Sequence, residues 1–283
     1  MYRTPARNSL KVTLYRYSMK QESCAPCNEF IVPELFSNVG NLVALQTTRA
    51  GGISPAPFAS LNLGRNTPDR PEHVAENTRR LCRLLRIEPD RLAGSDQVHG
   101  TRICNVLSPG FFEGYDALVT NTRNIYLCIF TADCFPVLLF DPETMAVAAI
   151  HAGWKGTAGG IAAKTVGMMQ ELFGSSPENL LALIGTGISQ AAYEIDSPVA
   201  KSFSNEHLIP SPGKAGKFML DLAGANRSQL LGSGLLPSRI ECSVHCSARD
   251  EALFYSYRRD EGRTGRMASI IGITGDPMPG QPQ

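Results

Sequence analysis

Long apolar runs, a surplus of charge of either sign and a regular cysteine pattern are all absent from this sequence. No apolar run approaches the roughly 18–20 residues that a membrane-spanning helix needs, so we expect no membrane partner. The formal net charge is +1, which argues against a nucleic-acid surface. Eight irregularly spaced cysteines do not form a disulfide framework, and they predict a reducing compartment, the cytoplasm.

The remaining composition fits one large globular domain. Apolar residues make up 43% and charged residues 19% of the 283 positions, as in ordinary globular proteins. We expect the domain to cover residues 30–275, between a basic N-terminal extension (1–29) and a Pro-rich tail (276–283), both disordered. The extension is also compatible with a transit peptide, because residues 1–21 carry five bases and no acid. Cys24 and Cys27 form a lone CxxC, to which we assign no function because a zinc ribbon needs a second pair.

The chain is organised around residues 131–160. Two short apolar runs, 137–140 and 145–150, lie between Pro and Gly punctuation and predict two strands joined by a turn. Cys134 precedes the first run and His151 ends the second. Four glycines follow before a helical pattern begins, a layout that lets backbone approach a ligand closely.

Other periodic segments complete an α/β pattern. Helices are predicted from about residue 67, over 161–173 and after a capping Asp221. Further strands are predicted at 42–48, 101–106, 115–120, 125–130, 180–184 and around 242–246.

Cationic residues suggest an anion site. Arg49 stands beside two glycines, Asn62 lies in the next loop, and residues 256–266 hold four arginines, including Arg258 and Arg263. We predict that Arg49 and this segment converge on the pocket that holds His151 and bind phosphate or a carboxylate there. The alternative is that these side chains are solvated.

His99, Cys134 and His151 would together make a three-ligand zinc site with a fourth position open. Such a site lowers the pKa of a bound water toward neutrality. The separations of 35 and 17 residues match no local zinc-finger spacing, so the residues alone leave this hypothesis open.

Six motifs in order carry a family resemblance. They are TRAGG (48–52), SLNLG (60–64), QVHGT (97–101), TADCFPV (131–137), HAGWKG (151–156) and SYRR (256–259). Over about residues 30–272 the sequence resembles the family variously called multicopper polyphenol oxidase, laccase-domain protein, peptidoglycan editing factor and purine nucleoside phosphorylase. It departs from the family pattern at Lys155, where Arg is commoner, at 185–188, where a Gly-Pro pair is usual, and at Ala192, where Cys is usual.

The resemblance implies a fold and a metal. The fold is α/β, with mixed β-sheets sandwiched between helices in α-β-β-α layers, related to cysteine hydrolase toxins of the cytotoxic necrotising type. The implied ligands are His99, Cys134 and His151, with one zinc ion per chain.

The resemblance also implies a zinc-dependent purine nucleoside enzyme. Its reaction would be phosphorolysis of adenosine, inosine and S-methyl-5'-thioadenosine to base and sugar 1-phosphate, with adenosine deamination as a companion activity. Nucleoside and phosphate would contact Arg49, Asn62, Lys155 and Arg258. Whether the chain forms a homodimer stays open.

Three other functions compete with this one. A peptidoglycan-precursor amidase would use Cys134 as a nucleophile activated by His151, although tightly bound zinc would quench the thiolate. A copper oxidase lacks ligands, because the chain has five histidines and no His-x-His pair, but Cu2+ can displace zinc in vitro. A zinc-stabilised binding module would need a closed, four-ligand site.

Asp133 precedes a ligand, and two roles are open to it. It could transfer protons in the pocket, or it could hold a ligand imidazole in one tautomer. We favour the second role, because metal-bound histidines almost always have such a partner.

Overall fold

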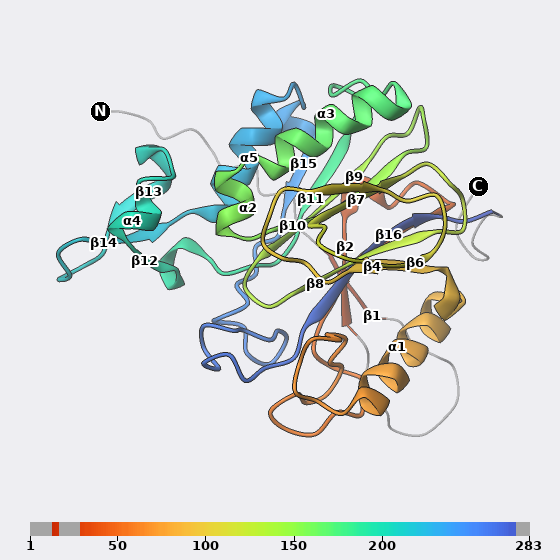
Figure 1. Ribbon diagram of the computed structural model, residues 1–283, viewed down its shortest axis with the longest axis horizontal. Coiled ribbons are helices and arrows are strands. Elements are labelled where there is room, and N and C mark those ends of the chain that lie inside the picture. The colour runs from red at the N-terminus through yellow and green to blue at the C-terminus, as the bar shows by residue number, and fades with distance from the viewer. Residues whose placement is uncertain (1–12, 17–28, 276–283) are drawn as a thin grey trace.

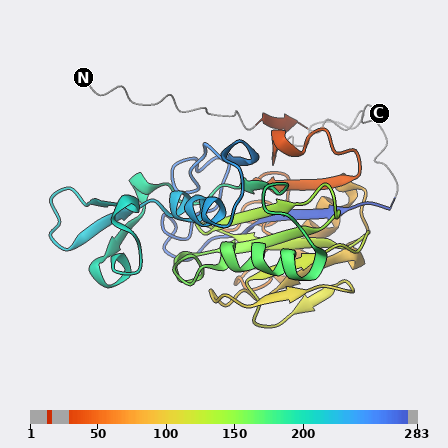
Figure 2. The same ribbon diagram turned by 90° about the horizontal axis from the view of Figure 1, so that it is seen from above.

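The computed structural model describes residues 13–16 and 29–275, and it has four layers. Two β-sheets pack face to face, with helix α1 (Pro71–Leu85) on one outer face and helices α2 (Trp154–Ala158), α3 (Ile161–Phe173) and α5 (Leu222–Gly232) on the other (Figures 1 and 2). This arrangement confirms the predicted α-β-β-α layers. The N-terminal extension with Cys24 and Cys27 lies almost wholly outside the described residues, as does the tail 276–283.

The first sheet has seven strands in the order β1-β2-β3-β16-β8-β4-β6. Their bounds are Thr13–Arg16, Glu29–Val32, Leu42–Thr47, Met267–Ile273, Tyr126–Thr131, Leu92–Ser95 and Gly110–Phe112. Most pairs are antiparallel, whereas β4 runs parallel to both β8 and β6.

The second sheet has six strands in the order β15-β11-β9-β10-β7-β5. Their bounds are Ile240–Cys242, Leu181–Ile184, Phe135–Phe140, Val147–Ala152, Ala117–Thr120 and Ile103–Asn105. Strands β9 and β10 pair antiparallel across the predicted turn at Asp141-Pro142. The strand predicted over 242–246 is wrong beyond Cys242, because Asp250 accepts hydrogen bonds from the His245 ring and the Cys246 amide instead.

Alternation along the central strands explains the layers. In β9, Leu138 and Phe140 point between the sheets, while Val137 and Leu139 pack toward α3. In β8, Ile129 points between the sheets and its neighbours pack under α1. Successive side chains of a strand point to opposite faces, and here both faces are buried. Apolar residues are therefore needed at every position, which gives the continuous apolar runs that predict these strands.

The predicted helix boundaries are largely confirmed. Helix α3 ends at Gly174, whose φ of 70° is left-handed, and the Asp221 carboxylate caps α5 by accepting the Gly224 N–H. Helix α1 begins at Pro71, later than predicted, because the Asp69 carboxylate holds the preceding loop through Ser54 and Asn62. No helix in the described part of the chain has the length and apolar character needed to cross a membrane.

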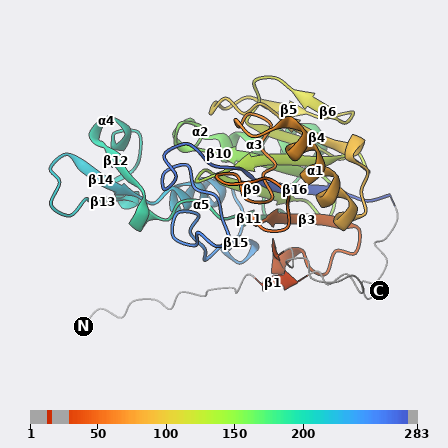
Figure 3. The same cartoon turned by 90° about the horizontal axis from the view of Figure 1, so that it is seen from below.

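A small three-stranded sheet projects from the layered core (Figures 1 and 3). It comprises β12 (Glu194–Asp196), β14 (Lys217–Leu220) and β13 (Leu208–Pro210), with helix α4 (Ser197–Ala200) beside it. The remaining elements are single 3₁₀ turns at Glu34–Phe36, Pro89–Arg91, Gln190–Ala192, Asn205–His207 and Pro237–Arg239.

Candidate metal centre

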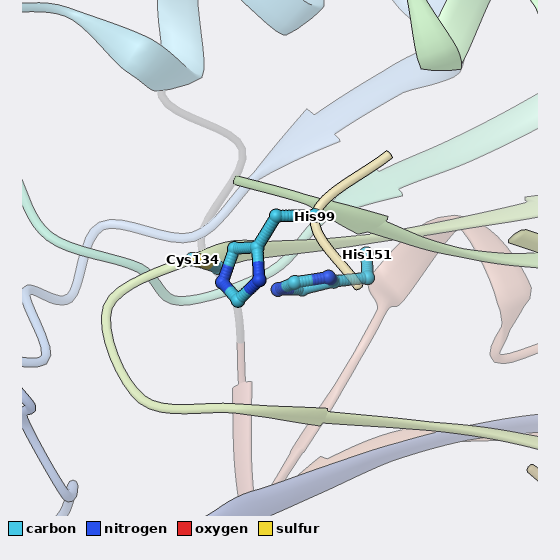
Figure 4. Close-up of side chains that lie close together, drawn as sticks. All are labelled: His99, Cys134 and His151. Atoms are coloured by element: carbon cyan, nitrogen blue, oxygen red, sulfur yellow. The ribbon is translucent and has the colours of Figure 1, made fainter. Parts of the chain in front are cut away.

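Three residues far apart in sequence meet at one end of the two sheets. His99 lies in the connection from β4 to β5 and Cys134 in the connection from β8 to β9, so both segments cross from the first sheet to the second. His151 lies on β10. One ligand atom of each lies within 4.8 Å of the others, the only such group of three or more potential ligands in 13–16 and 29–275. Figure 4 shows the two imidazoles, whose ring centroids are 4.7 Å apart, with Cys134 beside them.

Asp116 organises two of the three ligand residues. Its Oδ1 accepts hydrogen bonds from the backbone N–H of His99 and from the His151 ring at Nδ1, each at 2.8 Å. Its Oδ2 accepts the N–H of Gly100 at 2.6 Å. The Asp116 side chain is fully buried, and these bonds hold its pKa below the ordinary value despite the opposing effect of burial. The carboxylate therefore fixes both the loop of one histidine and the tautomer of the other, leaving Nε2 of His151 free for a metal.

The ligand loops adopt left-handed backbone conformations. The φ angles are 47° at Gln97, 61° at His99 and 84° at Asp133, values that non-glycine residues adopt rarely. The Gln97 amide stabilises its loop by pairing with both backbone groups of Phe130. Such conformations persist where surrounding contacts enforce them, as they do here.

Gly153 is required by the close approach of the ligands. A Cβ at this position would lie 3.0 Å from Cys134 Sγ and 3.1 Å from His99 Cδ2. The glycine-rich turn after His151 thus leaves room for the site, as the sequence predicted.

Charge couples the thiol to the imidazoles. Burial raises the pKa of the Cys134 thiol, but the adjacent His151 and His99 oppose this effect and lower that pKa to about 6. Burial opposes protonation of His151, yet Cys134 and Asp116 together raise the pKa of this imidazole to about 9. A thiolate among two imidazoles is a donor set that suits Zn2+.

The accessibility of the three ligands falls from His99 through Cys134 to His151. His99 is exposed, Cys134 is half-buried and His151 is buried. All three line one cavity of about 620 Å3, within the size range of small-molecule sites. An ion held by these donors would therefore keep one side open toward the cavity.

Cationic and aromatic side chains line the rest of this cavity. The cations are Arg65, Lys155, Arg258 and Arg266, and the aromatic residues are Phe111, Phe130, Trp154, Tyr193 and Tyr257. Guanidinium groups stack on three of the rings: Arg65 lies 4.6 Å from the Phe111 centroid, Arg258 5.2 Å from that of Tyr193 and Arg266 5.6 Å from that of Tyr257. The cavity thus offers both anion-binding groups and flat apolar surfaces.

Among the predicted site residues, Lys155, Arg258 and Asp133 line this cavity together with the ligand set. The role favoured for Asp133 is wrong, however, since the imidazole partner is Asp116. The Asp133 carboxylate instead accepts hydrogen bonds from the Ser247 hydroxyl at 2.7 Å and the Arg258 N–H at 2.6 Å. It fixes the loop that carries Arg258.

The predicted convergence of Arg49 and Arg263 on the metal cavity is wrong, because both line a separate one. The Arg49 guanidinium donates to the carbonyls of Ala59 and Glu251 and lies 4.7 Å from the Tyr255 ring centroid. These hydrogen bonds connect the loop of Ala59 to the loop of Glu251, so the donors that make them are not available to a ligand.

Asn62 also does not line the metal cavity. It is fully buried, and its Oδ1 accepts the N–H groups of Gly64 and Arg266 while its amide donates to Thr67 and Asp69. Its contribution to the cavity is indirect: it positions the backbone of Arg266, which does line it.

Asp116 and Arg65 were not recognised from the sequence. Asp116 is the second residue of the strand predicted over 115–120, and a carboxylate near the edge of a buried strand is the only signal that the sequence offers. Arg65 directly follows SLNLG, the motif that contains Asn62. Arg266 closes the arginine-rich segment and was predicted only as part of it.

Known proteins resemble this chain over most of its length. Residues 43–274 match the family described as "Multi-copper polyphenol oxidoreductase laccase". A purine nucleoside phosphorylase of Deinococcus radiodurans is 47% identical over 231 residues, covering 80% of this chain and 87% of that protein. The purine nucleoside phosphorylase YlmD of Geobacillus stearothermophilus is 38% identical, covering 81% and 89%.

Solved structures confirm the fold. The crystal structure of YlmD from Geobacillus stearothermophilus superimposes with a TM-score of 0.81 at 35% identity, covering 90% of this chain and 98% of that one. The crystal structure of the Bacillus licheniformis hypothetical protein YfiH gives a TM-score of 0.82 at 34% identity, with 88% and 97% covered.

Proposed function

This chain belongs to the multi-copper polyphenol oxidoreductase laccase family, and from that premise we propose that it is a zinc-dependent purine nucleoside phosphorylase. The observation that carries the proposal is a single 620 Å3 cavity in which a His-Cys-His donor set meets four cations and five aromatic side chains. Phosphorolysis brings together an anionic nucleophile, a flat purine and an electrophile that stabilises negative charge. The cations could bind the first, the aromatic rings could bind the second, and a metal held by the donor set could supply the third.

The chain's own residues can bind both reactants. Lys155 makes no hydrogen bond to any described side chain, so its ammonium is available for a phosphate oxygen. Arg258 donates one N–H to the Glu194 carbonyl, and its other guanidinium N–H groups make no hydrogen bond to a described residue. Tyr193 and Tyr257 offer ring faces on which a purine can stack.

The reaction exchanges one bond at the sugar for another. The bond between C1' and the purine nitrogen breaks, an oxygen of hydrogen phosphate bonds to C1', and the departing base takes up the proton that the phosphate loses. Lys155 and Arg258 would hold the phosphate in line with C1', which lowers the entropic part of the barrier.

The donor set fits zinc better than copper oxidase chemistry. One thiolate and two imidazoles within 4.8 Å of one another match the three protein ligands of catalytic zinc sites, whose fourth position is left to water or substrate. A zinc ion bound there supplies a Lewis acid beside the substrate. We propose one zinc per chain, with Cu2+ as a competitor in vitro.

Finer features of the proposal follow the family resemblance. We propose adenosine, inosine and S-methyl-5'-thioadenosine as substrates, adenosine deamination as a companion activity, and the cytoplasm as the location. Deamination would use the same ligand set and the same purine-binding surface.

One observation favours a second candidate, a cysteine hydrolase acting on cell-wall precursors. Cys134, His151 and Asp116 form a nucleophile–base–carboxylate series, with a thiol pKa near 6. This is the arrangement that activates a cysteine nucleophile, and it agrees with the proposed fold relation to cytotoxic necrotising toxins. The two candidates differ in what zinc does: phosphorolysis requires it, whereas a hydrolytic thiolate is blocked by it.

Two assays, of nucleoside products and of amide hydrolysis, separate the two candidates. The zinc-loaded protein is incubated with inosine or adenosine, with and without phosphate, and base, sugar phosphate and deaminated nucleoside are resolved chromatographically. We expect base and ribose 1-phosphate in equal amounts, only with phosphate present, and loss of both in Cys134→Ala. Absence of sugar phosphate, together with thiol-dependent amide hydrolysis that appears on zinc removal, would replace this proposal with the hydrolase.

A further inference from the structure

A second and larger cavity adjoins the metal cavity. Its volume is about 910 Å3, and it lies between the N-terminal half of α1 and the adjacent end of the seven-stranded sheet. Figures 1 and 3 show α1 beside β4 and β6, which form this end of the sheet. Apolar side chains dominate the walls, namely Leu63, Val74, Leu92, Phe111, Cys128 and Phe130. We call this cavity the α1 groove.

Three residues form the wall between the α1 groove and the metal cavity, because Arg65, Phe111 and Phe130 line both. The Arg65 guanidinium lies 4.6 Å from the centroid of the Phe111 ring. Arg65 is exposed and Phe111 is 40% exposed. The partition therefore consists largely of side chains at the surface, which can change rotamer without moving the sheet.

Gly94 provides space beneath these rings. It pairs with Phe111 across strands β4 and β6, and a Cβ at Gly94 would lie 3.4 Å from both the Phe111 and the Phe130 rings. Both aromatic side chains thus pack over a glycine, with the edge strand β6 beside them. The wall has an apolar face on the groove side.

Few charged groups face into the α1 groove, and most have partners. Arg79 pairs with Glu76, and Asp90 lies 3.8 Å from Arg91. Arg65, the remaining cation, stacks on the wall. Apart from Arg65, which belongs to the wall and also lines the metal cavity, the groove has no unpaired cation for a phosphate or carboxylate, and its apolar lining suits an alkyl or thioether chain.

We propose that the α1 groove is a second subsite of the nucleoside pocket and binds an apolar substituent carried by the nucleoside. This proposal rests on the proposed function and adds substrate selectivity to it. The shared wall of Arg65, Phe111 and Phe130 supports this occupant, since a short chain on a purine nucleoside in the metal cavity would reach the groove once the exposed Phe111 side chain changes rotamer. The attachment point is either the 5' position of the sugar or N6 of the base.

The test measures binding of two homologous series. One consists of 5'-alkylthio-5'-deoxyadenosines and the other of N6-alkyladenosines, each from methyl to hexyl. Dissociation constants are measured by calorimetry on the zinc-loaded protein without phosphate, so the readout does not depend on turnover. We expect affinity to rise about fourfold per methylene in one series, the factor for burying a CH2 group, and to stay flat in the other.

A matched pair of variants localises the effect. Ala75 is an exposed residue of α1 that lines the groove, so Ala75→Trp should fill it and remove the gain with chain length. Arg83 is exposed on the same helix but outside the groove, and Arg83→Trp should leave the gain intact. Both variants should bind unsubstituted adenosine like the parent protein.

Two results would overturn the proposal: flat affinity in both series, or a gain that Ala75→Trp leaves unchanged. Failure of the proposed function looks different, because adenosine would then give no sugar phosphate whatever its affinity. The binding series and the product assay therefore fail independently.

Discussion

Replacing Asp116 with Asn tests the central feature of the site, the carboxylate that holds two ligand residues. Asn keeps the size and one acceptor oxygen but replaces the other oxygen with an NH2 donor. In the native site three donors point at this carboxylate: the N–H groups of His99 and Gly100 and the ring of His151. At least one donor must then face another donor, and the remaining bonds lose their charge assistance.

The size of the effect follows from those contacts. A hydrogen bond to a charged group contributes about 1.5–3 kcal/mol, and loss of a partner behind a metal-binding histidine weakens metal binding by about 10–100-fold. We therefore expect Asp116→Asn to bind zinc about 10–100-fold more weakly in a competition titration with a chelator. Excess zinc should restore most of the activity, and circular dichroism should show a folded protein.

Asp133→Asn is the matched control. This carboxylate is also buried in the cavity wall and also accepts two hydrogen bonds, but from Ser247 and the Arg258 amide and not from a ligand. Zinc affinity should therefore change little. Wild-type zinc affinity in Asp116→Asn, or a larger loss in Asp133→Asn, would refute the assignment of Asp116 as the partner of His151.

Three further predictions follow from the described contacts. Cys134→Ser should lower the zinc content from about one ion per chain to near zero by elemental analysis, with the fold kept because the core is large without the metal. Lys155→Ala should raise KM for phosphate about tenfold with little change in Tm, whereas Arg49→Ala should lower stability by about 1–3 kcal/mol in urea unfolding and leave KM unchanged. Burial raises the pKa of the Glu241 carboxyl above 4.5, so the folded state disfavours the ionised form. The ionised carboxylate therefore lowers the stability of the folded protein increasingly as pH rises from 4.5 through the pKa of the folded state. The difference in Tm between Glu241→Gln and wild type should therefore increase in favour of the variant between pH 4 and pH 7. A difference in Tm that does not depend on pH would contradict this reasoning.

The strands beside the metal centre were predictable because their side chains obey a local rule. In β9 and β10 every residue is buried, and the short apolar runs between Pro and Gly leave few alternatives to a central strand. The helix ends at Gly174 and Asp221 were predictable for the same reason, since a left-handed C-cap and an acidic N-cap each depend on one residue.

The partners of the site residues could not be predicted in this way. Asp116 contacts His151, 35 positions later, only because β7 and β10 pair in one particular register. Arg49 and Asn62 carry suitable donors, but these donors make hydrogen bonds to other parts of the protein and are not available to a ligand. Residue type indicates what a side chain can bind, whereas the register of distant strands decides whether the side chain remains available.

The crossing of two chain segments at the metal centre bears on how the protein folds. His99 and Cys134 each lie where the chain passes from one sheet to the other, so neither sheet by itself contains the donor set. The ligands become neighbours only after the two sheets have docked, a late and non-local event of the kind that slows folding. Metal uptake during refolding should accordingly lag behind the recovery of β-structure, and its rate measures the docking step.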